Sequence, residues 1–294
     1  MPTPRVVVVH RHTEYDELIA RHGTRGQAEF FLTTRGRDLG AVENRHGRTR
    51  EALTVVSSGI PGEWARAEVE RGDLSRFVFR PEDIIVVVGQ DGLVANLAKY
   101  VDDQPVIGID PLSDGTAGVL VPHRPHALRG LLKGVVAGTA QTLERTMVRA
   151  TSDDGQSLTA LNEIYVGQPT HQSSRYTLHV AESVERQSSS GIIIGSGTGA
   201  TGWCASLQQA QAPELSLPSP ADATLAWFVR EAWPSASTGT SMTHGIITGS
   251  RLRLVIESDT LVAFGDGMEA DRLTLAWGQG LTVDVAEGTL KTVC

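Results

Sequence analysis

One aspartate stands between two glycines, at a place where a carboxylate could do chemistry. Asp91 follows an apolar, β-branched run, Ile84 to Val88, and is bracketed by Gly89 and Gly92. Such a run predicts a strand buried on both faces, as in a parallel sheet, and a helical pattern follows it. A strand, a glycine-bracketed turn and a helix present a ligand loop at the carboxyl edge of an open α/β sheet. The residues leave two roles open for Asp91: contact with a ligand, or capping of the helix.

A polar pair, Asn162 and Glu163, interrupts an otherwise apolar strand pattern. Unpaired buried polar groups cost about 1–3 kcal/mol each, so this pair needs partners. Asn offers a donor and an acceptor, and an ionised Glu accepts hydrogen bonds. The pair suits a hydroxyl-bearing ligand or the edge of an adenine. The alternative is a strand end bonded to a neighbouring loop.

A third segment, residues 191–203, reads GIIIGSGTGATGW. It predicts a strand, then a turn rich in glycine and hydroxyl groups, then a helix from about Gly202 to Gln211. Backbone N–H groups at a helix start, together with threonine hydroxyls, form a cradle for phosphate or another polar ligand. Trp203 could stack on a base. A tight turn with a core tryptophan is the alternative, although three glycines and two threonines in seven residues exceed what a turn needs.

The elements that must position these segments fall into two regions. Residues 1–123 alternate strand and helix patterns, with strands at Arg5 to His10 and Pro105 to Asp110, which predicts a doubly wound α/β domain with a parallel sheet. Within it, Trp64 to Leu74 is predicted to be helical. The stretch from Arg21 to Arg50 is predicted to be helical with breaks at Gly23, Gly26, Gly36 and Gly40. Residues 124–294 read as β-rich. Their last strands are predicted at 251–258, 260–264, 272–277 and 281–285, the spacing of an antiparallel sheet.

Composition narrows the function classes. The net charge of −8 does not suggest a nucleic-acid surface, and no apolar run approaches the length of a membrane span. The N-terminus lacks the pattern of a signal peptide. Two distant cysteines, Cys204 and Cys294, imply neither a disulfide framework nor a zinc site, and His123 with His126 lacks a third metal ligand nearby. We therefore expect a cytoplasmic protein without a nucleic-acid or membrane partner and without a metal held directly by the protein.

The order of the three segments resembles the NAD kinase family. Its GGDGT motif is matched by GQDGL at 89–93, its Asn-Glu pair by residues 162–163, and its GLIVSTPTGSTAY motif by residues 191–203. The strand PVIGID at 105–110 resembles the family's PVLGIN. Within the family, the local sequence resembles the mitochondrial-type branch most. The shared features are the run IDPLSDGTAG at 109–118, SSG before the third motif, Trp203 in place of tyrosine, and VRE at 229–231. Asp266-Gly267 resembles the family's closing DG turn.

This resemblance implies a fold of the NAD kinase and diacylglycerol kinase-like type. Residues 1–123 would form the α/β domain with the Gly-Asp-Gly loop, and residues 124–294 a β-sandwich-like domain with the dinucleotide site. The C-terminal tail would pack back on the first domain, and substrate would bind in the cleft between the domains. The implied activity is transfer of the γ-phosphoryl of ATP, carried with Mg²⁺, to the 2′-hydroxyl of the adenosine ribose of NAD or NADH. A homodimer is also expected by resemblance.

The resemblance assigns roles residue by residue. Asp91 would contact the reacting hydroxyl. The phosphate and ATP loop would comprise Gly89, Gln90, Gly92 and Leu93. The substrate-binding residues would be Asn162, Glu163, Ser190, Thr198, Gly199, Thr201, Gly202, Trp203 and Ser206.

The match departs from the family where the phosphoryl donor is expected. Gln90 replaces a glycine, and a left-handed backbone there would carry a strain of about 1–3 kcal/mol. Leu93 replaces a threonine and removes a hydroxyl, and Ser190 stands where many members have aspartate. These departures keep two other functions open: a kinase of the same superfamily for another hydroxylated small molecule (a nucleoside, a sugar or a lipid-like alcohol), and a catalytically silent dinucleotide-binding protein.

Overall fold

The protein forms two compact units, described in a computed structural model for residues 4–112 and 118–294. Unit 1 comprises Met1–Leu143 and Lys291–Cys294, and unit 2 comprises Glu144–Leu290. The chain therefore first passes from unit 1 to unit 2 after Leu143, whereas the sequence predicted a domain boundary at 123. None of the described helices is both long and apolar enough to cross a bilayer.

Unit 1 is built on a parallel sheet whose strand order is β2-β1-β3-β4. The strands are β1 (Arg5–His10), β2 (Ala65–Glu70), β3 (Ile84–Val88) and β4 (Val106–Ile109). Every residue of β3 and β4 is buried, which explains their uninterrupted apolar sequences. The end of β16 (Gly280–Val293) adds to this sheet, because Thr292 pairs with Val106 in parallel.

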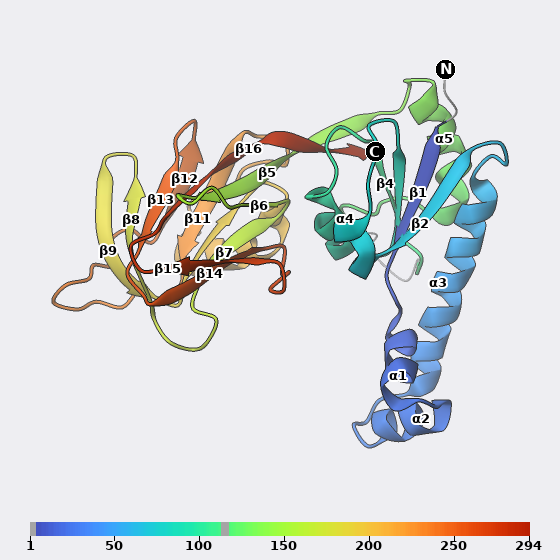
Figure 1. The fold of residues 1–294 in the computed structure, drawn as a ribbon, viewed down its shortest axis with the longest axis horizontal. Helices are drawn as coiled ribbons and strands as arrows, with labels where there is room; N and C mark the ends of the chain where they lie inside the picture. The colour runs from blue at the N-terminus through green and yellow to red at the C-terminus, as the bar shows by residue number, and fades with distance from the viewer. Residues whose placement is uncertain (1–3, 113–117) are drawn as a thin grey trace. The chain divides into compact units, whose positions relative to one another are not determined.

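Seven helical segments in the described part of unit 1 surround this sheet or extend from it. They are α1 (Glu14–His22), α2 (Arg25–Thr33), α3 (Leu39–Gly59), η1 (Arg71–Arg76), α4 (Asp91–Ala98) and η2 (Pro125–Ala127) with α5 (Leu128–Val136) directly after it. Figure 1 shows α3 running along the sheet and continuing beyond it to α1 and α2. The two ends of α3 belong to different hydrophobic clusters. Leu39 and Val42 pack with α1 and α2, whereas Ala52 and Val56 pack on the sheet together with Leu128 of α5.

Two local predictions in unit 1 need correction. The segment 64–74, predicted to be helical, forms the strand β2 followed by the short 3-10 helix η1. The strand reads ARAEVE, a period of two in which Val69 alone is buried, and β1 offers it a parallel edge. Of the four predicted breaks, Gly23 and Gly36 interrupt the helices with positive φ angles of 78° and 67°, but Gly26 lies inside α2 and Gly40 inside α3.

Unit 2 consists of two packed antiparallel layers. The first layer contains β5 (Thr142–Ser152), β6 (Ser157–Ala160), β8 (Ser174–Val180), β9 (Ser183–Ser189), β13 (Leu252–Ile256) and most of β16. The second has the order β12-β11-β10-β7-β14-β15. Its strands are β12 (His244–Thr248), β11 (Thr224–Val229), β10 (Ile192–Gly195), β7 (Glu163–Gly167), β14 (Thr260–Gly265) and β15 (Arg272–Ala276).

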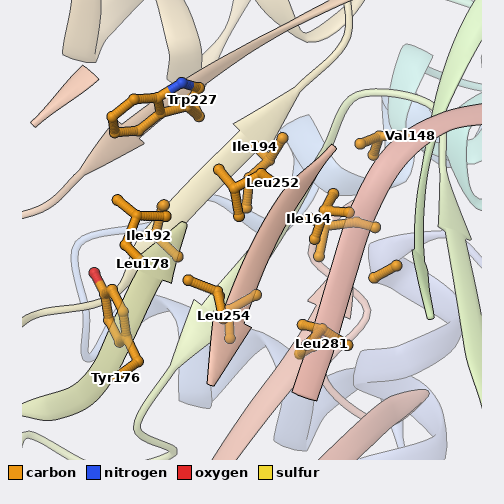
Figure 2. Packing of buried hydrophobic residues seen from close by; sticks show 14 of the residues in the cluster. Val148, Ile164, Tyr176, Leu178, Ile192, Ile194, Trp227, Leu252, Leu254 and Leu281 are labelled. Carbon is orange, nitrogen blue, oxygen red and sulfur yellow. The ribbon is translucent and has the colours of Figure 1, made fainter. Parts of the chain in front are cut away.

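The core of unit 2 lies between these layers. Figure 2 shows Leu178, Leu252 and Leu254 of the first layer packed with Ile192 and other residues of the second. The outer face of the second layer is covered too, because α6 (Trp203–Gln211) places Cys204 in a separate cluster with Ile193 and Phe228. Burial on both faces explains why β10 is apolar throughout.

The predicted fold class is confirmed: an α/β domain with a parallel sheet is joined to a β-rich, sandwich-like domain. The four C-terminal strands predicted from turn spacing correspond to β13, β14, β15 and β16. Part of the IDPLSDGTAG run, residues 113–117, lies outside the described residues.

Candidate functional site

Asp91 is the first residue of α4, directly beyond the carboxyl end of β3. Its two carboxylate oxygens accept hydrogen bonds from the backbone N–H groups of Val119 and Leu120, each at 2.9 Å. The side chain therefore holds a loop that lies 28 and 29 residues further along the chain. Since an ionised carboxylate has about four lone-pair positions, these bonds leave acceptor capacity on both oxygens.

The close approach around Asp91 depends on small residues. A Cβ at Gly118 would lie 2.1 Å from Asp91 Oδ1, and one at Gly89 would lie 2.9 Å from Leu93 Cδ2. Leu93 is buried, and its side chain lies against Gly89. Gly92, in contrast, has open space where a side chain would be.

Gln90 adopts an ordinary extended backbone, with φ −109° and ψ 167°. The backbone strain expected for a left-handed residue at this position is therefore absent. Having glutamine where the family motif has glycine costs no backbone energy here. Gln90 is exposed and occupies the N-cap position of α4, but its side chain makes no capping hydrogen bond.

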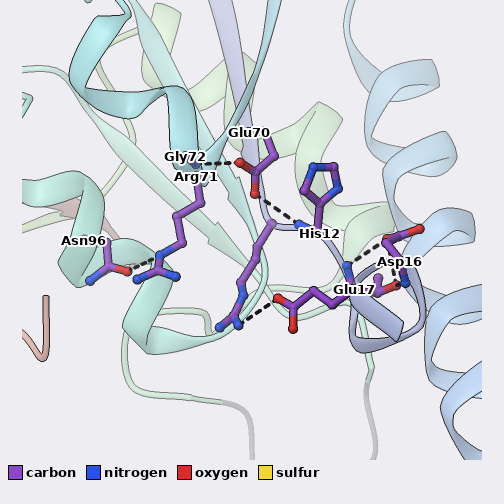
Figure 3. Close-up of polar contacts among 9 residues, drawn as sticks. His12, Asp16, Glu17, Glu70, Arg71, Gly72 and Asn96 are labelled. Atoms are coloured by element: carbon purple, nitrogen blue, oxygen red, sulfur yellow. Dashed lines mark hydrogen bonds and ion pairs between the residues drawn. The ribbon is translucent and has the colours of Figure 1, made fainter. Parts of the chain in front are cut away.

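Polar side chains brace the same carboxyl edge of the unit 1 sheet (Figure 3). Glu70, at the end of β2, accepts hydrogen bonds from the backbone N–H groups of His12 and Gly72. Arg71 Nε donates to Asn96 Oδ1 at 2.7 Å, which ties η1 to α4. Of these bonds, the one between Arg71 and Asn96 reaches the helix that begins with Asp91.

In unit 2, Asn162 and Glu163 lie at the start of β7, where the backbone is held from two sides. Asp266, just past the end of β14, accepts hydrogen bonds from the N–H groups of Leu161 at 2.8 Å and Asn162 at 2.7 Å. The carbonyl of Asn162 accepts the N–H of Ser196 at 2.8 Å. Among the described residues, neither the side-chain amide of Asn162 nor the carboxyl of Glu163 has a hydrogen-bond partner.

Glu163 is electrostatically unusual. Burial, and secondarily the charge of Asp266, raises the pKa of Glu163 from 4.5 to about 7. Burial and the nearby Glu163 likewise raise the pKa of the Cys204 thiol to about 12. Near neutral pH, Glu163 is therefore divided between a charged acceptor and a neutral form that can donate a hydrogen bond.

The turn after β10 brings the predicted hydroxyl groups beside this pair. A Cβ at Gly199 would lie 2.3 Å from the carbonyl oxygen of Asn162, so the turn touches the Asn-Glu backbone directly. Thr198 is 4% exposed, and its hydroxyl has no hydrogen-bond partner within the described parts of the chain. A buried hydroxyl in that state costs about 1–3 kcal/mol, which a ligand or a water molecule can recover. Thr201 differs, since its hydroxyl donates to the carbonyl of Thr198 at 3.2 Å.

An aromatic cluster flanks the start of α6. The rings of Trp203 and Tyr165 stack with centroids 6.1 Å apart and an interplanar angle of 13°. The guanidinium of Arg230 lies 5.4 Å from the Trp203 ring centroid. The Tyr165 hydroxyl donates to the carbonyl of Ser190 at 3.1 Å, which connects Ser190 to this cluster. Trp203 is 37% exposed, so it is not the core residue of the alternative interpretation.

The remaining predicted residues lie at the same helix start. Gly202 is the N-cap of α6 and is exposed, and its carbonyl accepts the N–H of Ser206, also exposed, at 3.2 Å. The predicted substrate-binding residues thus gather around β7, β10 and the start of α6 in unit 2, whereas Asp91 and the predicted phosphate loop belong to unit 1.

Three participants were not among the predicted site residues. Tyr165 shares a face of β7 with Glu163, a placement that strand alternation could have signalled. Arg230 and Asp266 were noticed only as parts of runs that resemble a family. Their contacts with Trp203 and Asn162 join distant parts of the sequence, so no local pattern reveals them. Within the described residues, no group of three or more His, Cys, Asp or Glu side chains could hold a metal ion.

Comparisons with known proteins relate the chain to one enzyme class. No protein-family model matches the chain. It is similar to curated NAD kinases from Chlorobaculum tepidum (28% identical over 145 residues, 48% of this chain and 47% of that protein), Cytophaga hutchinsonii (27% over 129 residues, 41% and 43%) and Rickettsia bellii (28% over 128 residues, 41% and 48%). The matched region thus spans about half the length of these relatives.

A fold comparison covers more of the chain. The solved structure of yeast NADH kinase complexed with NADH matches with a TM-score of 0.61 over 100% of this chain and 84% of that chain, at 15% identity. The two proteins share a fold of an α/β unit and a β-rich unit. At this identity the likeness shows a shared fold.

Proposed function

We propose that the chain is a kinase that transfers the γ-phosphoryl group of ATP to the 2′-hydroxyl of the adenosine ribose of NAD or NADH. The observation that carries the proposal is its sequence similarity to three curated NAD kinases. The fold shared with yeast NADH kinase agrees with it. The proposal also includes two finer expectations: that the chain is closest to the mitochondrial-type branch of NAD kinases, and that it forms a homodimer.

In this proposal Asp91 orients the hydroxyl that attacks the γ-phosphorus. The new P–O bond forms as the bond to the leaving ADP breaks, and Asp91 takes the hydroxyl proton late in the transfer. Phosphoryl transfer passes through a loose transition state, so positioning and charge neutralisation matter more than base strength. The free lone pairs of the Asp91 oxygens can accept that proton while the backbone bonds to Val119 and Leu120 keep the carboxylate in place.

The nucleotide groups are assigned by chemistry. Mg²⁺ enters with the ATP phosphates and neutralises their charge. The N–H groups after Gly89 and the open space at Gly92 allow the chain to approach phosphate closely. In unit 2, Asn162, Glu163 and the unpartnered Thr198 hydroxyl supply polar contacts for NAD, and Trp203 supplies an exposed ring for stacking.

A direct assay tests the proposal. The purified full chain is incubated with ATP, Mg²⁺ and either NAD or NADH, and products are identified by mass and by reaction with an NADP-dependent dehydrogenase. NADP(H) formed only in the complete mixture supports the proposal. If neither NADP nor NADPH appears while the protein is folded, the proposal is wrong.

One observation favours a second function, a dinucleotide-binding protein without kinase activity. Leu93 replaces the hydroxyl residue of the family motif and is buried, so this loop offers the phosphoryl donor one group fewer. This function predicts that NAD raises the melting temperature although no product forms. Binding and turnover measured on the same sample separate the two functions.

A further inference from the structure

Asp266 holds the Asn-Glu segment by a set of three backbone hydrogen bonds. Its carboxylate accepts the N–H groups of Leu161 at 2.8 Å and Asn162 at 2.7 Å, and its own N–H donates to the carbonyl of Glu163 at 3.1 Å. Two N–H donors stabilise the ionised form of a carboxylate. The segment that carries Asn162 and Glu163 is therefore fixed by a side chain more than 100 residues away in sequence.

The backbone at Asp266 accounts for part of its residue type. Asp266 and Gly267 have φ angles of 52° and 68°, and the N–H of Met268 donates to the carbonyl of Gly265 at 2.9 Å. A turn with two left-handed residues favours Asn-Gly or Asp-Gly, so either residue would satisfy the turn. Only aspartate, however, supplies two oxygens for two N–H donors, because an Asn side chain has one oxygen and one NH₂ group.

Asp266 is also the cross-strand neighbour of Glu163. Gly265 of β14 pairs with Ile164 of β7 in an antiparallel register, which sets the next residue, Asp266, opposite Glu163. Like charges directly opposite one another are unfavourable. Among the described residues, the thiol of Cys204 in α6 also lies beside Glu163, and burial keeps this thiol neutral.

We propose that Asp266 is a positioning residue for the Asn162-Glu163 pair. It aligns the pair through the backbone and adds to the effect of burial in keeping Glu163 neutral when ligand binds. The substrate role of the pair rests on the function proposed above, but the effect of Asp266 on Glu163 does not. Burial and the charge of Asp266 raise the pKa of Glu163 to about 7, in keeping with this role.

The consequence is dinucleotide binding that weakens as the pH rises. NAD carries a pyrophosphate, so a neutral Glu163 repels it less than an ionised one, and only the neutral form can donate a hydrogen bond. If the neutral form alone binds, the Kd for NAD increases about tenfold between pH 6 and pH 8. In Asp266→Asn, burial still raises the pKa of Glu163 but the charge of Asp266 is lost, so this pKa lies between 4.5 and 7. The neutral fraction of Glu163 is then smaller at both pH values, so Kd is higher than in the natural chain at each and increases by more than tenfold, up to about 100-fold, between pH 6 and pH 8.

Two measurements test the proposal on the full chain. Carboxyl ¹³C NMR of glutamate-labelled protein, with the Glu163 signal assigned by Glu163→Gln, follows the ionisation of Glu163 without ligand. We expect a midpoint near pH 7 in the natural chain and a clearly lower midpoint in Asp266→Asn, together with faster hydrogen exchange at Leu161 and Asn162. Calorimetric titration with NAD at pH 6 and pH 8 then measures the coupling to binding.

A matched control separates this role from general stabilisation. Asp153 also accepts a backbone N–H in unit 2, that of Gly280 at 2.8 Å. Asp153→Asn should leave the Glu163 midpoint and the pH dependence of NAD binding unchanged. A Glu163 midpoint near 4.5 in the natural chain, or one that Asp266→Asn does not lower, overturns the proposal; the first result needs no variant to fold. If the natural chain binds no NAD, the proposed function fails, while the NMR titration still decides the role of Asp266.

Discussion

Asp91 Oδ1 accepts the backbone N–H of Leu120 at 2.9 Å, and this bond links the start of α4 to a loop beyond β4. The neighbouring N–H of Val119 bonds the second oxygen at the same distance. The residue proposed to contact the substrate hydroxyl thus has a structural task as well. Variants of Asp91 therefore need separate measurements of activity and of stability, because loss of activity alone does not distinguish a lost substrate contact from a displaced loop.

We predict that Asp91→Asn abolishes turnover with little loss of NAD binding. Asp91→Ala should in addition lower the free energy of unfolding by about 1–3 kcal/mol, since two N–H groups lose their acceptor.

Gly118→Ala provides a complementary test of Asp91, because the alanine Cβ would meet Asp91 Oδ1 at 2.1 Å and displace the carboxylate. It should reduce turnover although Asp91 is present. Urea unfolding, calorimetry with NAD and the kinase assay measure the three quantities. Full activity in Asp91→Asn would remove Asp91 from the mechanism.

Restoring the family's threonine at Leu93 should harm the protein rather than improve it. Leu93 is buried and lies against Gly89, so Leu93→Thr removes apolar contacts and buries a hydroxyl. We expect the free energy of unfolding to fall by about 1–3 kcal/mol. Gln90→Gly is the matched control in the same loop: Gln90 is exposed and unstrained, so the change should stay within about 1 kcal/mol. Equal stability of Leu93→Thr and the natural chain in chemical denaturation would contradict the packing role.

Local sequence patterns predicted the elements that burial alone determines. The runs Ile84 to Val88 and Ile192 to Ile194 are apolar because both faces of their strands are covered, and each was predicted to be a strand. The strand β2 was missed because most of its residues are not buried and its pairing with β1 joins residues about 60 positions apart. Edge strands of this kind are set by the neighbour that they extend, which no short window contains.

The same limit applies to the candidate site. Asn162 and Glu163 were selected because polar groups inside an apolar pattern need partners, and Thr198 because it belongs to a turn rich in glycine and hydroxyl groups. Asp266, which fixes two of them, reads in sequence only as part of a turn, and its contact with Asn162 spans 104 residues. The backbone of Gln90 shows the opposite case, because the extended φ of −109° removes a strain that sequence comparison alone suggested.

The turn after β10 should tolerate no side chain at Gly199. An alanine Cβ there would lie 2.3 Å from the carbonyl oxygen of Asn162, so the turn or the Asn-Glu segment must move. We expect Gly199→Ala to lower the free energy of unfolding by roughly 1–3 kcal/mol and to weaken NAD binding. Gly130→Ala in α5 is the control, because its Cβ meets nothing within 4 Å and alanine favours a helix by about 1 kcal/mol. Unchanged melting temperature and NAD affinity in Gly199→Ala would show that the contact is dispensable.

The raised pKa of Glu163 predicts an unusual pH dependence of stability. Between its ordinary value of 4.5 and its folded value of about 7, the folded protein binds this proton more tightly than the unfolded chain, so the free energy of unfolding falls as the pH rises through that window. Glu163→Gln resembles the neutral form and lacks this loss. At pH 8 without ligand, the variant should be more stable than the natural chain by roughly 1–3 kcal/mol, with little difference near pH 4. Glu182→Gln, at an exposed position, should follow the natural chain at every pH. If Glu163→Gln and the natural chain lose stability in parallel from pH 5 to pH 8, Glu163 is not the group that titrates there.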